Sequence, residues 1–364
     1  MREPEIEAQG PERATRTVVA MSGGVDSSVA AALLVEQGHD VVGVSMQLYD
    51  NSGGFGTCCT IDDLHDARRV AARLGIPHYI VNFESHFHAH VQQNFIDEYA
   101  RGRTPIPCAH CNSEVKFSEL LSRAGGYGAS HLATGHYARL ERGDDGRVRL
   151  WRGRDAAKDQ SYFLFSLTQA QLAMASFPVG DLPKDQVRAH AHRLGLAVAD
   201  KPDSQEICFV PDGDYAGFLE RAEPALAAAG TIVDHTGRTL GTHGGVHRFT
   251  VGQRKGLGLS VGVPLYVVAI DAAAQAVTVG PREALDRRTL TASKVNWISG
   301  DAPSGWTALT AQIRHRHHAA SARVRALDGG RAEVEFEAPQ TAVSPGQAVV
   351  FYDGDAVLGG GWID

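Results

Sequence analysis

The chain has 364 residues, of which 43% are hydrophobic, and its formal net charge is −7. That length predicts two or three domains, and the charge argues against a uniformly basic coat, so any nucleic acid would have to meet local patches. No apolar run reaches the roughly eighteen residues of a membrane span, and the N-terminal residues match neither a signal peptide nor an Arg-rich transit peptide. We therefore expect a cytoplasmic protein without a membrane anchor.

Along the first 200 residues, short apolar strands alternate with helical patterns. After a tail to residue 14 that we expect to be disordered, we predict strands at 17–21, 40–46, 78–83 and 131–140 and helices at 27–37, 61–74 and 181–196. A Gly- and Cys-rich loop at 52–59 and a hairpin around Gly143–Gly146 complete the pattern. Such alternation is typical of a parallel sheet in an α/β fold.

Beyond about residue 212 the pattern changes to strands separated by Gly and Pro, as in a small β-rich domain or barrel. We predict an α/β catalytic domain at 15–211, a small central α+β domain at 212–287 and a C-terminal β-barrel at 288–364.

The residues Ser22–Ser28 stand between the first predicted strand and the first helix. Gly23 and Gly24 permit a tight turn, and backbone N–H groups at a helix start favour a bound phosphate. The stretch lacks the Gly-Lys-Ser/Thr ending of the mononucleotide P-loop. It resembles the pyrophosphate loop (PP-loop) of enzymes that split ATP into AMP and pyrophosphate, in which the acidic residue, here Asp26, sits near magnesium.

Five cysteines are too few for a disulfide framework in a chain of this length, so metal binding or catalysis is the expected use. Cys108 and Cys111 form a C-x-x-C, which is either half of a zinc site or a redox pair. Zinc would need two further ligands, which Cys58 and Cys59 could supply, although adjacent cysteines rarely both point at one metal. A metal site at His86, His88 and His90 is a weaker alternative, because only the first and last share a helix face.

Six motifs in one order resemble the bacterial tRNA-specific 2-thiouridylases, which replace the C2 oxygen of the wobble uridine with sulfur. The motifs are SGGVDSS at 22–28, TPIPCAHCNSEVKF at 104–117, ATGHYARL at 133–140, KDQSYFLF at 158–165, DSQEICFV at 203–210 and HRFTVGQRKGLG at 247–258. The resemblance implies an adenine nucleotide alpha hydrolase-like PP-loop domain and a tRNA-uridine 2-sulfurtransferase activity.

The resemblance also implies a chemical role for two cysteines. ATP would adenylate uridine O2 with release of pyrophosphate, and AMP would then be the leaving group. Cys208 would carry the persulfide and Cys111 would be the nucleophile, which either frees sulfide from Cys208 or resolves the persulfide after its attack. Both routes end in a transient Cys111–Cys208 disulfide.

Binding residues follow from the same resemblance. ATP, with Mg²⁺, would be bound by Ala20, Met21, Ser22, Gly23, Gly24, Val25, Asp26, Ser27, Met46 and Gly135. The tRNA would be contacted by Ile106, Pro107, Cys108, His136, Lys158, Asp159, Gln160, Arg314, His315 and Gln347. The partners implied are the tRNA and a sulfur-donor protein, with the chain itself a monomer and no resident metal.

One position departs from the family pattern. Where the commonest family loop has Asn-Pro-Asp, this chain has Ile106-Pro107-Cys108. The Asp of the family is proposed to act as an acid or base toward the target base. Here three alternatives stay open: Cys108 takes this role, a nearby carboxylate takes it, or the reaction needs no such group. Two other functions stay open on the residues alone: a different ATP pyrophosphatase of the amidotransferase or argininosuccinate-ligase type, and a zinc-bearing RNA-binding protein.

Overall fold

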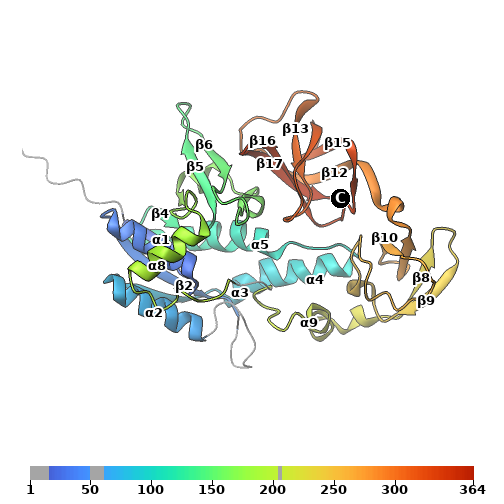
Figure 1. Ribbon diagram of the computed structural model, residues 1–364, viewed down its shortest axis with the longest axis horizontal. Coiled ribbons are helices and arrows are strands. Elements are labelled where there is room, and N and C mark those ends of the chain that lie inside the picture. Colours follow the sequence, from blue (N-terminus) through green and yellow to red (C-terminus); the bar gives the residue numbers. More distant parts are fainter. Residues whose placement is uncertain (1–15, 50–60, 204–206) are drawn as a thin grey trace, which may run out of the picture.

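The computed structural model describes residues 16–49, 61–203 and 207–364, which form three β-sheets. Figure 1 shows the α/β domain at the left, a barrel at the upper right and a small sheet at the lower right. The predicted tail at 1–14 and the predicted loop at 52–59, with Cys58 and Cys59, lie outside the described residues.

The sheet of the α/β domain has five strands, all parallel, and β1 is at its centre. The strands, in their order across the sheet, are β3 (His78–Asn82), β2 (Asp40–Gln47), β1 (Arg16–Ala20), β4 (His131–Ala133) and β7 (Ala175–Ser176). Because successive side chains of a strand point to opposite faces, Val18 packs into one hydrophobic cluster and Val19 into another. The predicted parallel α/β sheet is confirmed.

Helices cover both faces of this sheet. On the Val19 face lie α1 (Val25–Glu36), α2 (Ile61–Leu74) and α8 (Lys184–Arg193), close to the three predicted helices. The opposite face is covered by α3 (Glu84–Phe87), η1 (His88–Gln92), α4 (Gln93–Ala100), α5 (Pro107–His110), η2 (Cys111–Leu120), α6 (Leu121–Ala124) and η3 (Gly125–Tyr127). Helix α1 is apolar on nearly all sides because it is enclosed by the sheet, α2 and α8.

The prediction of one strand at 131–140 is wrong. The chain leaves the parallel sheet after β4, and Thr134–Tyr137 separate it from β5 (Ala138–Arg142), which forms the expected hairpin with β6 (Val148–Arg152). Strand β6 then pairs with the last strand of the chain, β17 (Ala356–Ile363), through Trp151 and Ala356. The hairpin of the α/β domain therefore belongs to the sheet of the C-terminal barrel, which local alternation of residues cannot predict.

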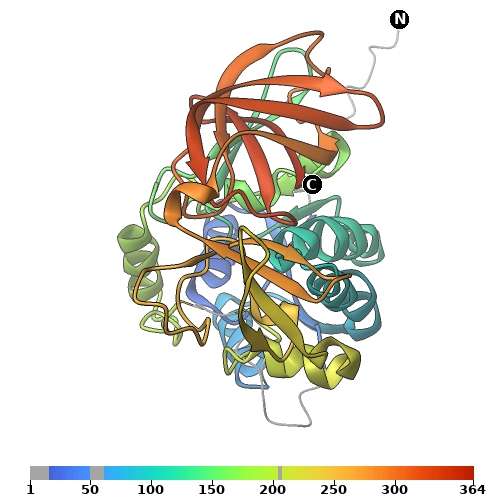
Figure 2. The ribbon, with the colours of Figure 1, turned by 90° about the vertical axis from the view of Figure 1, so that its right-hand side faces the viewer.

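The barrel is formed by six strands, and β12 pairs with both β15 and β17 to close it. Its strands are β12 (Asp286–Asn296), β13 (Thr307–Gln312), β14 (Ala320–Leu327), β15 (Arg331–Thr341), β16 (Ala348–Asp353) and β17. Figure 2 shows the barrel above the other two parts of the molecule. The predicted C-terminal β-barrel is confirmed.

A small sheet is formed by the segment that lies, in the sequence, between the α/β domain and the six-stranded barrel. It has four strands in the order β10-β11-β8-β9. The segment contains α9 (Tyr215–Ala222), η5 (Pro224–Ala227), β8 (Gly230–Asp234), β9 (Thr239–His243), η6 (Val246–Arg248), β10 (Tyr266–Asp271), β11 (Ala276–Gly280) and η7 (Arg282–Leu285).

The remaining elements of the α/β domain are η4 (Ser161–Leu164) and α7 (Gln169–Ala173). Within the described ranges, no helix is long and apolar enough to cross a membrane.

Candidate active site

The loop Ser22–Ser28 forms a tight turn at the start of α1, after the carboxyl end of β1. Gly23 has a φ of +74°, and a Cβ on it would lie 2.2 Å from the carbonyl oxygen of Asp63, so only glycine fits. The hydroxyl of Ser27 accepts from the N–H of Ser22 at 3.2 Å, whereas that of Ser28 is buried and donates to the carbonyl of Gly24 at 2.8 Å. Ser28 therefore stabilises the turn and does not face a ligand.

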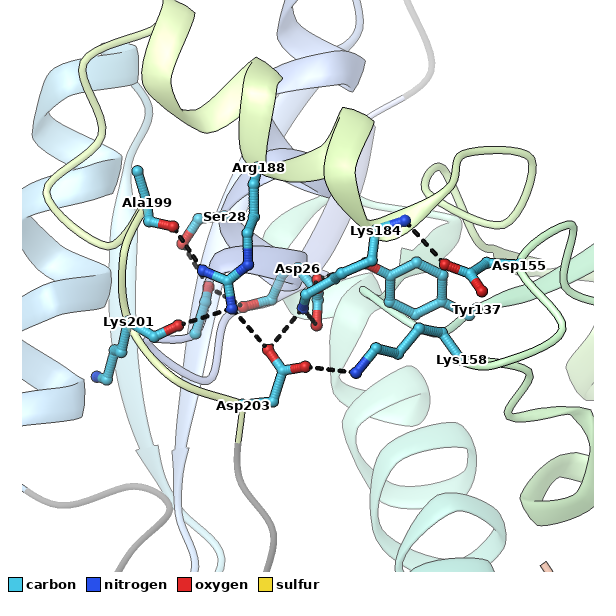
Figure 3. Close-up of polar contacts among 12 residues, drawn as sticks. Asp26, Ser28, Tyr137, Asp155, Lys158, Lys184, Arg188, Ala199, Lys201 and Asp203 are labelled. Atoms are coloured by element: carbon cyan, nitrogen blue, oxygen red, sulfur yellow. Dashed lines mark hydrogen bonds and ion pairs between the residues drawn. The ribbon is translucent and has the colours of Figure 1, made fainter. Parts of the chain in front are cut away.

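A lysine from helix α8 neutralises the acidic residue of this loop. Lys184 Nζ lies 2.7 and 2.9 Å from the two carboxylate oxygens of Asp26, and the hydroxyl of Tyr137 donates to the same carboxylate at 2.7 Å (Figure 3). Burial and the carboxylate of Asp26 raise the pKa of Tyr137 far above its ordinary value, which keeps the hydroxyl a donor. Sequence analysis gave Lys184 no role beyond its place in the helix predicted at 181–196.

Asp203 accepts from three cations beside the PP-loop. Its carboxylate bonds Lys158 at 2.7 Å, Lys184 at 2.8 Å and Arg188 at 3.1 Å (Figure 3). Burial alone would raise the pKa of Asp203, but the bonds from Lys158 and Lys184 outweigh it and lower the pKa to about 2. The carboxylate is thus ionised at neutral pH and holds a cluster of positive charge against the loop.

Lys201 fixes the other side of the same loop. Its ammonium donates to the carbonyl of Gly23 at 3.0 Å and to the carboxylates of Asp63 and Asp66 at 2.5 and 2.6 Å. Burial by itself lowers the pKa of Lys201, but the two carboxylates outweigh this and raise it. Sequence reasoning missed Lys201 and Asp203, although Asp203 is the first residue of the DSQEICFV motif and Lys201 lies two residues before it.

Two further predicted nucleotide residues lie at the carboxyl edge of the parallel sheet. Met46 is near the end of β2 and is buried in the cluster on the Val18 face. Gly135 follows β4, and a Cβ on it would lie 2.5 Å from the Ser27 nitrogen, so the chain can pass the PP-loop only at a glycine. Parallel sheets bind their ligands at this edge.

The predicted nucleophile lies where α5 continues into η2. Cys111 is 8% exposed and belongs to the same cluster as Met46, whereas Cys108, one helical turn earlier, is exposed. The next residue, Asn112, donates to the carbonyl of Phe163 at 3.1 Å and accepts from Lys116 at 3.0 Å. Asn112 and Lys116, both in the TPIPCAHCNSEVKF motif, are thus hydrogen-bonded to each other. Through Asn112 the helix is also hydrogen-bonded to the KDQSYFLF segment, which contains Phe163.

Cys208 packs against the cluster that contains Cys111. Its carbonyl accepts from the hydroxyl of Tyr49 at 3.0 Å. The next side chain, Phe209, makes edge-on contacts with Phe87 and Phe95, at 5.6 and 5.2 Å between ring centroids. These ring contacts of Phe209 fix the backbone next to Cys208. Residues 204–206, which precede this segment, lie outside the described part of the chain.

A histidine lies between the two cysteines of the C-x-x-C. His110 stacks on Trp362 of the barrel, with ring centroids 4.3 Å apart and planes 9° from parallel. Burial, and secondarily Lys294, lower the pKa of His110 to about 4, so the imidazole is neutral at pH 7. The barrel therefore supports the helix that carries Cys111.

The structure places the residues predicted to contact tRNA in three groups. Cys108 is exposed, while Ile106 and Pro107 are buried beneath it. Four of the residues form hydrogen bonds or ion pairs within the protein. Asp159 accepts from Arg152 at 2.7 Å, and Gln160 accepts from the N–H of Tyr137. His136 is hydrogen-bonded to Thr134, and Lys158 is paired with Asp203 as described above. The barrel residues are Arg314, bonded to the carbonyl of Thr341, His315, packed on Phe163, and Gln347.

The described ranges contain no group of three His, Cys, Asp or Glu side chains arranged to hold a metal ion. His86 and His90 lie 4.4 Å apart between ring centroids, on one helix face as expected, without a third ligand among the residues described. Cys58 and Cys59, on which a zinc site with Cys108 and Cys111 would depend, lie outside the described residues.

Comparison with known proteins gives matches along almost the whole chain. Three family models match it: a tRNA methyl transferase HUP domain at residues 15–212, a tRNA methyl transferase PRC-barrel domain at 217–281 and an aminomethyltransferase beta-barrel domain at 287–363. A solved 4-thiouridine synthetase–RNA complex with bound ATP is 18% identical over 58% of this chain and 50% of that chain, with a TM-score of 0.38.

Curated relatives match far more closely. The tRNA-specific 2-thiouridylase MnmA of Geotalea uraniireducens is 56% identical over 96% of this chain and 95% of its own. The protein of the same name from Geobacter metallireducens is 56% identical over 96% of both chains. Identity at this level, together with the family-model matches, means that the chain belongs to the tRNA-specific 2-thiouridylase family.

Proposed function

We propose that this protein thiolates C2 of the wobble uridine in tRNA in an ATP-dependent reaction. The observation that carries the proposal is the grouping of Met46, Cys111 and Cys208 around one hydrophobic cluster of the domain that holds the PP-loop. Activation of an oxygen requires a nucleotide-binding loop, and the sulfur transfer that follows requires two thiols. The two thiols here come from positions nearly a hundred residues apart in the sequence.

The first step is activation of the uridine. Its C2 oxygen attacks the α-phosphorus of ATP, a new P–O bond forms, and pyrophosphate leaves with the electrons of the broken bond. The backbone N–H groups of the PP-loop would hold the phosphates, and Lys184 and Arg188 would offset their negative charge. Both cations already lie beside Asp26 or Asp203 in the structure.

The second step is transfer of sulfur from a persulfide on Cys208. In one route the terminal sulfur attacks C2, AMP leaves, and the Cys111 thiolate breaks the S–S bond to Cys208. In the other route Cys111 attacks first, and the sulfide it frees displaces AMP. Each route leaves 2-thiouridine and a Cys111–Cys208 disulfide, which an external thiol must reduce before the next cycle.

The residues present fit a magnesium ion brought in with ATP. Asp26 supplies one partly exposed carboxylate at the loop, and Mg²⁺ at such sites is commonly bound by one or two carboxylates together with substrate phosphates. The ion would neutralise phosphate charge. We further propose that a sulfur-donor protein loads Cys208 and that the chain acts as a monomer in the cytoplasm.

The two half-reactions can be tested separately. Purified protein is given unmodified tRNA, ATP and a cysteine desulfurase with cysteine. The first step is measured as tRNA-dependent exchange of pyrophosphate into ATP, and the second as 2-thiouridine by nucleoside mass spectrometry. We expect Cys208→Ser to retain exchange and lose 2-thiouridine, and Cys111→Ser to lose 2-thiouridine as well. Full 2-thiouridine from either variant would rule out the proposed sulfur chemistry.

Cys108→Ser serves as the third variant, because Cys108 is exposed one helical turn from Cys111. A normal yield of 2-thiouridine from it shows that this thiol replaces no essential acid or base. Loss of exchange in this variant alone would assign it the proton-handling role of the missing aspartate. The alternative functions give different results: adenylation of a free amino acid, or stoichiometric zinc without any ATP turnover in the presence of tRNA.

A further inference from the structure

The proposed function uses Cys111 and leaves the other cysteine of the C-x-x-C without a role. Cys108 occupies the position at which the commonest family loop has an aspartate, so a thiol stands here in place of a carboxylate. A carboxylate can transfer a proton, whereas a thiolate can also attack a disulfide. The proposed reaction ends in a disulfide at Cys111, which lies three residues from this additional thiol.

Cys108 and Cys111 lie one above the other on a single helical turn. The N–H of Cys111 donates to the carbonyl of Cys108, and the backbone of Cys111 is helical, with φ −59° and ψ −39°. Residues three apart in an α-helix share one face, and the helical rise and radius place their Cα atoms about 5 Å apart. Disulfides join Cα atoms that are roughly 4.4 to 6.8 Å apart. A disulfide between these two cysteines therefore needs rotation of two side chains and no movement of the backbone.

The backbone of this turn is held by the barrel at two points. Before the turn, the N–H of Thr104 donates to the carbonyl of Pro345 at 2.8 Å, and the side-chain amide of Gln347 donates to the carbonyl of Thr104 at 2.9 Å. Within the turn, His110 stacks on Trp362. These contacts fix the helical turn and so keep its two thiols one turn apart.

The three thiols differ in their access to solvent. Cys108 is exposed and Cys208 is half-buried, whereas Cys111 is 8% exposed and belongs to the hydrophobic cluster against which Cys208 packs. An external thiol must reach one of the two sulfurs to reduce a disulfide. A Cys111–Cys208 disulfide joins a buried residue to a half-buried one, whereas a disulfide between Cys108 and Cys111 includes an exposed residue that a reductant can reach.

We propose that Cys108 is a resolving thiol that transfers the disulfide from the active site to the surface. The Cys108 thiolate attacks the sulfur of Cys111, a Cys108–Cys111 bond forms, and the bond to Cys208 breaks with its electron pair on Cys208. The number of disulfides is unchanged, and Cys208 gains a proton equivalent to the one that Cys108 loses. An external dithiol then reduces the Cys108–Cys111 bond and is itself oxidised to a disulfide. The inference rests on the proposed function and explains how Cys208 becomes available for the next sulfur.

The test compares the full wild-type chain with Cys108→Ser and Cys108→Asp. Both variants lack the thiol, but Cys108→Asp restores the carboxylate of the commonest family loop. Each protein is loaded with persulfide by a cysteine desulfurase and cysteine, freed of small thiols, and given ATP and unmodified tRNA for a single turnover. The sample is quenched, its thiols are blocked with N-ethylmaleimide, and the disulfide is located by peptide mass spectrometry. We expect a Cys108–Cys111 disulfide in the wild type and a Cys111–Cys208 disulfide in both variants.

Reduction of the spent proteins gives a second readout. A thioredoxin-type dithiol is added after the single turnover, and the return of protein thiols is followed over time. We expect reduction to be at least about tenfold slower in both variants than in the wild type, because the dithiol must then reach the buried Cys111 or the half-buried Cys208. The position of the disulfide in the wild type tests the proposal even if a variant fails to fold.

Three results would overturn the proposal. The first is a wild-type disulfide that stays between Cys111 and Cys208, and the second is an equal rate of reduction in all three proteins. The third is a metal ion bound by both Cys108 and Cys111, found by elemental analysis of the wild type, because neither thiolate could then exchange. Failure of the proposed function is distinguishable, because the wild type would then form no 2-thiouridine in the single turnover. Failure of the resolving role alone leaves 2-thiouridine formed and the disulfide between Cys111 and Cys208.

Discussion

Lys184 and Asp26 form an ion pair of 2.7 Å across 158 residues of sequence, and the lysine also reaches Asp203 at 2.8 Å. The pair connects helix α8 to the first turn of α1, where the PP-loop ends. Because the side chain of Lys184 is only 12% exposed, water screens its charge little, and its ammonium group interacts mainly with the loop. The acidic residue of the PP-loop is thereby neutralised by a lysine of the same chain.

Removing this lysine should weaken nucleotide binding. In Lys184→Ala, Asp26 loses its counter-charge beside the loop that would hold phosphates, and we expect the Kd of a non-hydrolysable ATP analogue, measured by calorimetry, to rise about 10- to 100-fold. Arg193→Ala is the control, since Arg193 lies on the same helix but pairs with Glu36. An unchanged Kd in Lys184→Ala would exclude a role for this lysine in phosphate binding.

A methyl group at Gly135 should displace the PP-loop. The Cβ of Gly135→Ala would meet backbone atoms of Asp26 and Ser27 at 2.6 and 2.5 Å, and backbone cannot move aside as a flexible side chain can. We expect a loss of about 1–3 kcal/mol in the free energy of unfolding and weaker binding of the ATP analogue. Gly126→Ala, where a Cβ has no atom within 4 Å, should leave both unchanged. Equal behaviour of the two variants would contradict the steric argument.

Lys201 should contribute to stability through Asp63 and Asp66, whose side chains are only 8% and 14% exposed. Lys201→Ala removes the cation that the two largely buried carboxylates share, although Arg69 still pairs with Asp66, and we expect a loss of about 1–3 kcal/mol in urea unfolding. In the double variant with Asp63→Asn the losses should be less than additive, because one partner of the ion pair is already neutral. Strict additivity would show that the ammonium and the carboxylate do not interact.

His110 should make stability depend on pH in the acid range. Its pKa is about 4 in the folded protein and 6.5 as the ordinary value, so the unfolded chain binds more protons between these limits. The contribution is complete above pH 6.5 and is lost as the pH falls toward 4, by about 2 kcal/mol between pH 7 and pH 5. His110→Phe, which keeps an aromatic ring against Trp362, should lose correspondingly less over this interval.

The comparison for His110 is urea unfolding at pH 7 and at pH 5, with His88→Gln as the control on an exposed helix position. The control should follow the wild type at both pH values. If His110→Phe also followed the wild type, the imidazole would have to become protonated equally in both states, and its burial against Trp362 could not be the cause of the lowered pKa.

The sequence alone predicted those features that a few neighbouring residues encode. The PP-loop could be read from SGGVDSS because the turn, the glycines and the helix start lie within seven residues, and the strands and helices around it follow from their periodicity. The motifs also selected Cys111 and Cys208 by resemblance, although no pattern in the chain gives their separation in space.

Only the tertiary structure decided which distant groups meet. Lys184, Lys201 and Asp203 reach the PP-loop from more than 130 residues away, and a lysine on a polar helix face has no local signature that distinguishes a buried ion pair from a solvated side chain. The hairpin 138–152 likewise joins the barrel because its hydrogen-bonding edge meets β17, a pairing over some 200 residues. Local propensity determines that a strand forms, whereas packing and hydrogen bonding across the whole chain determine which sheet it joins.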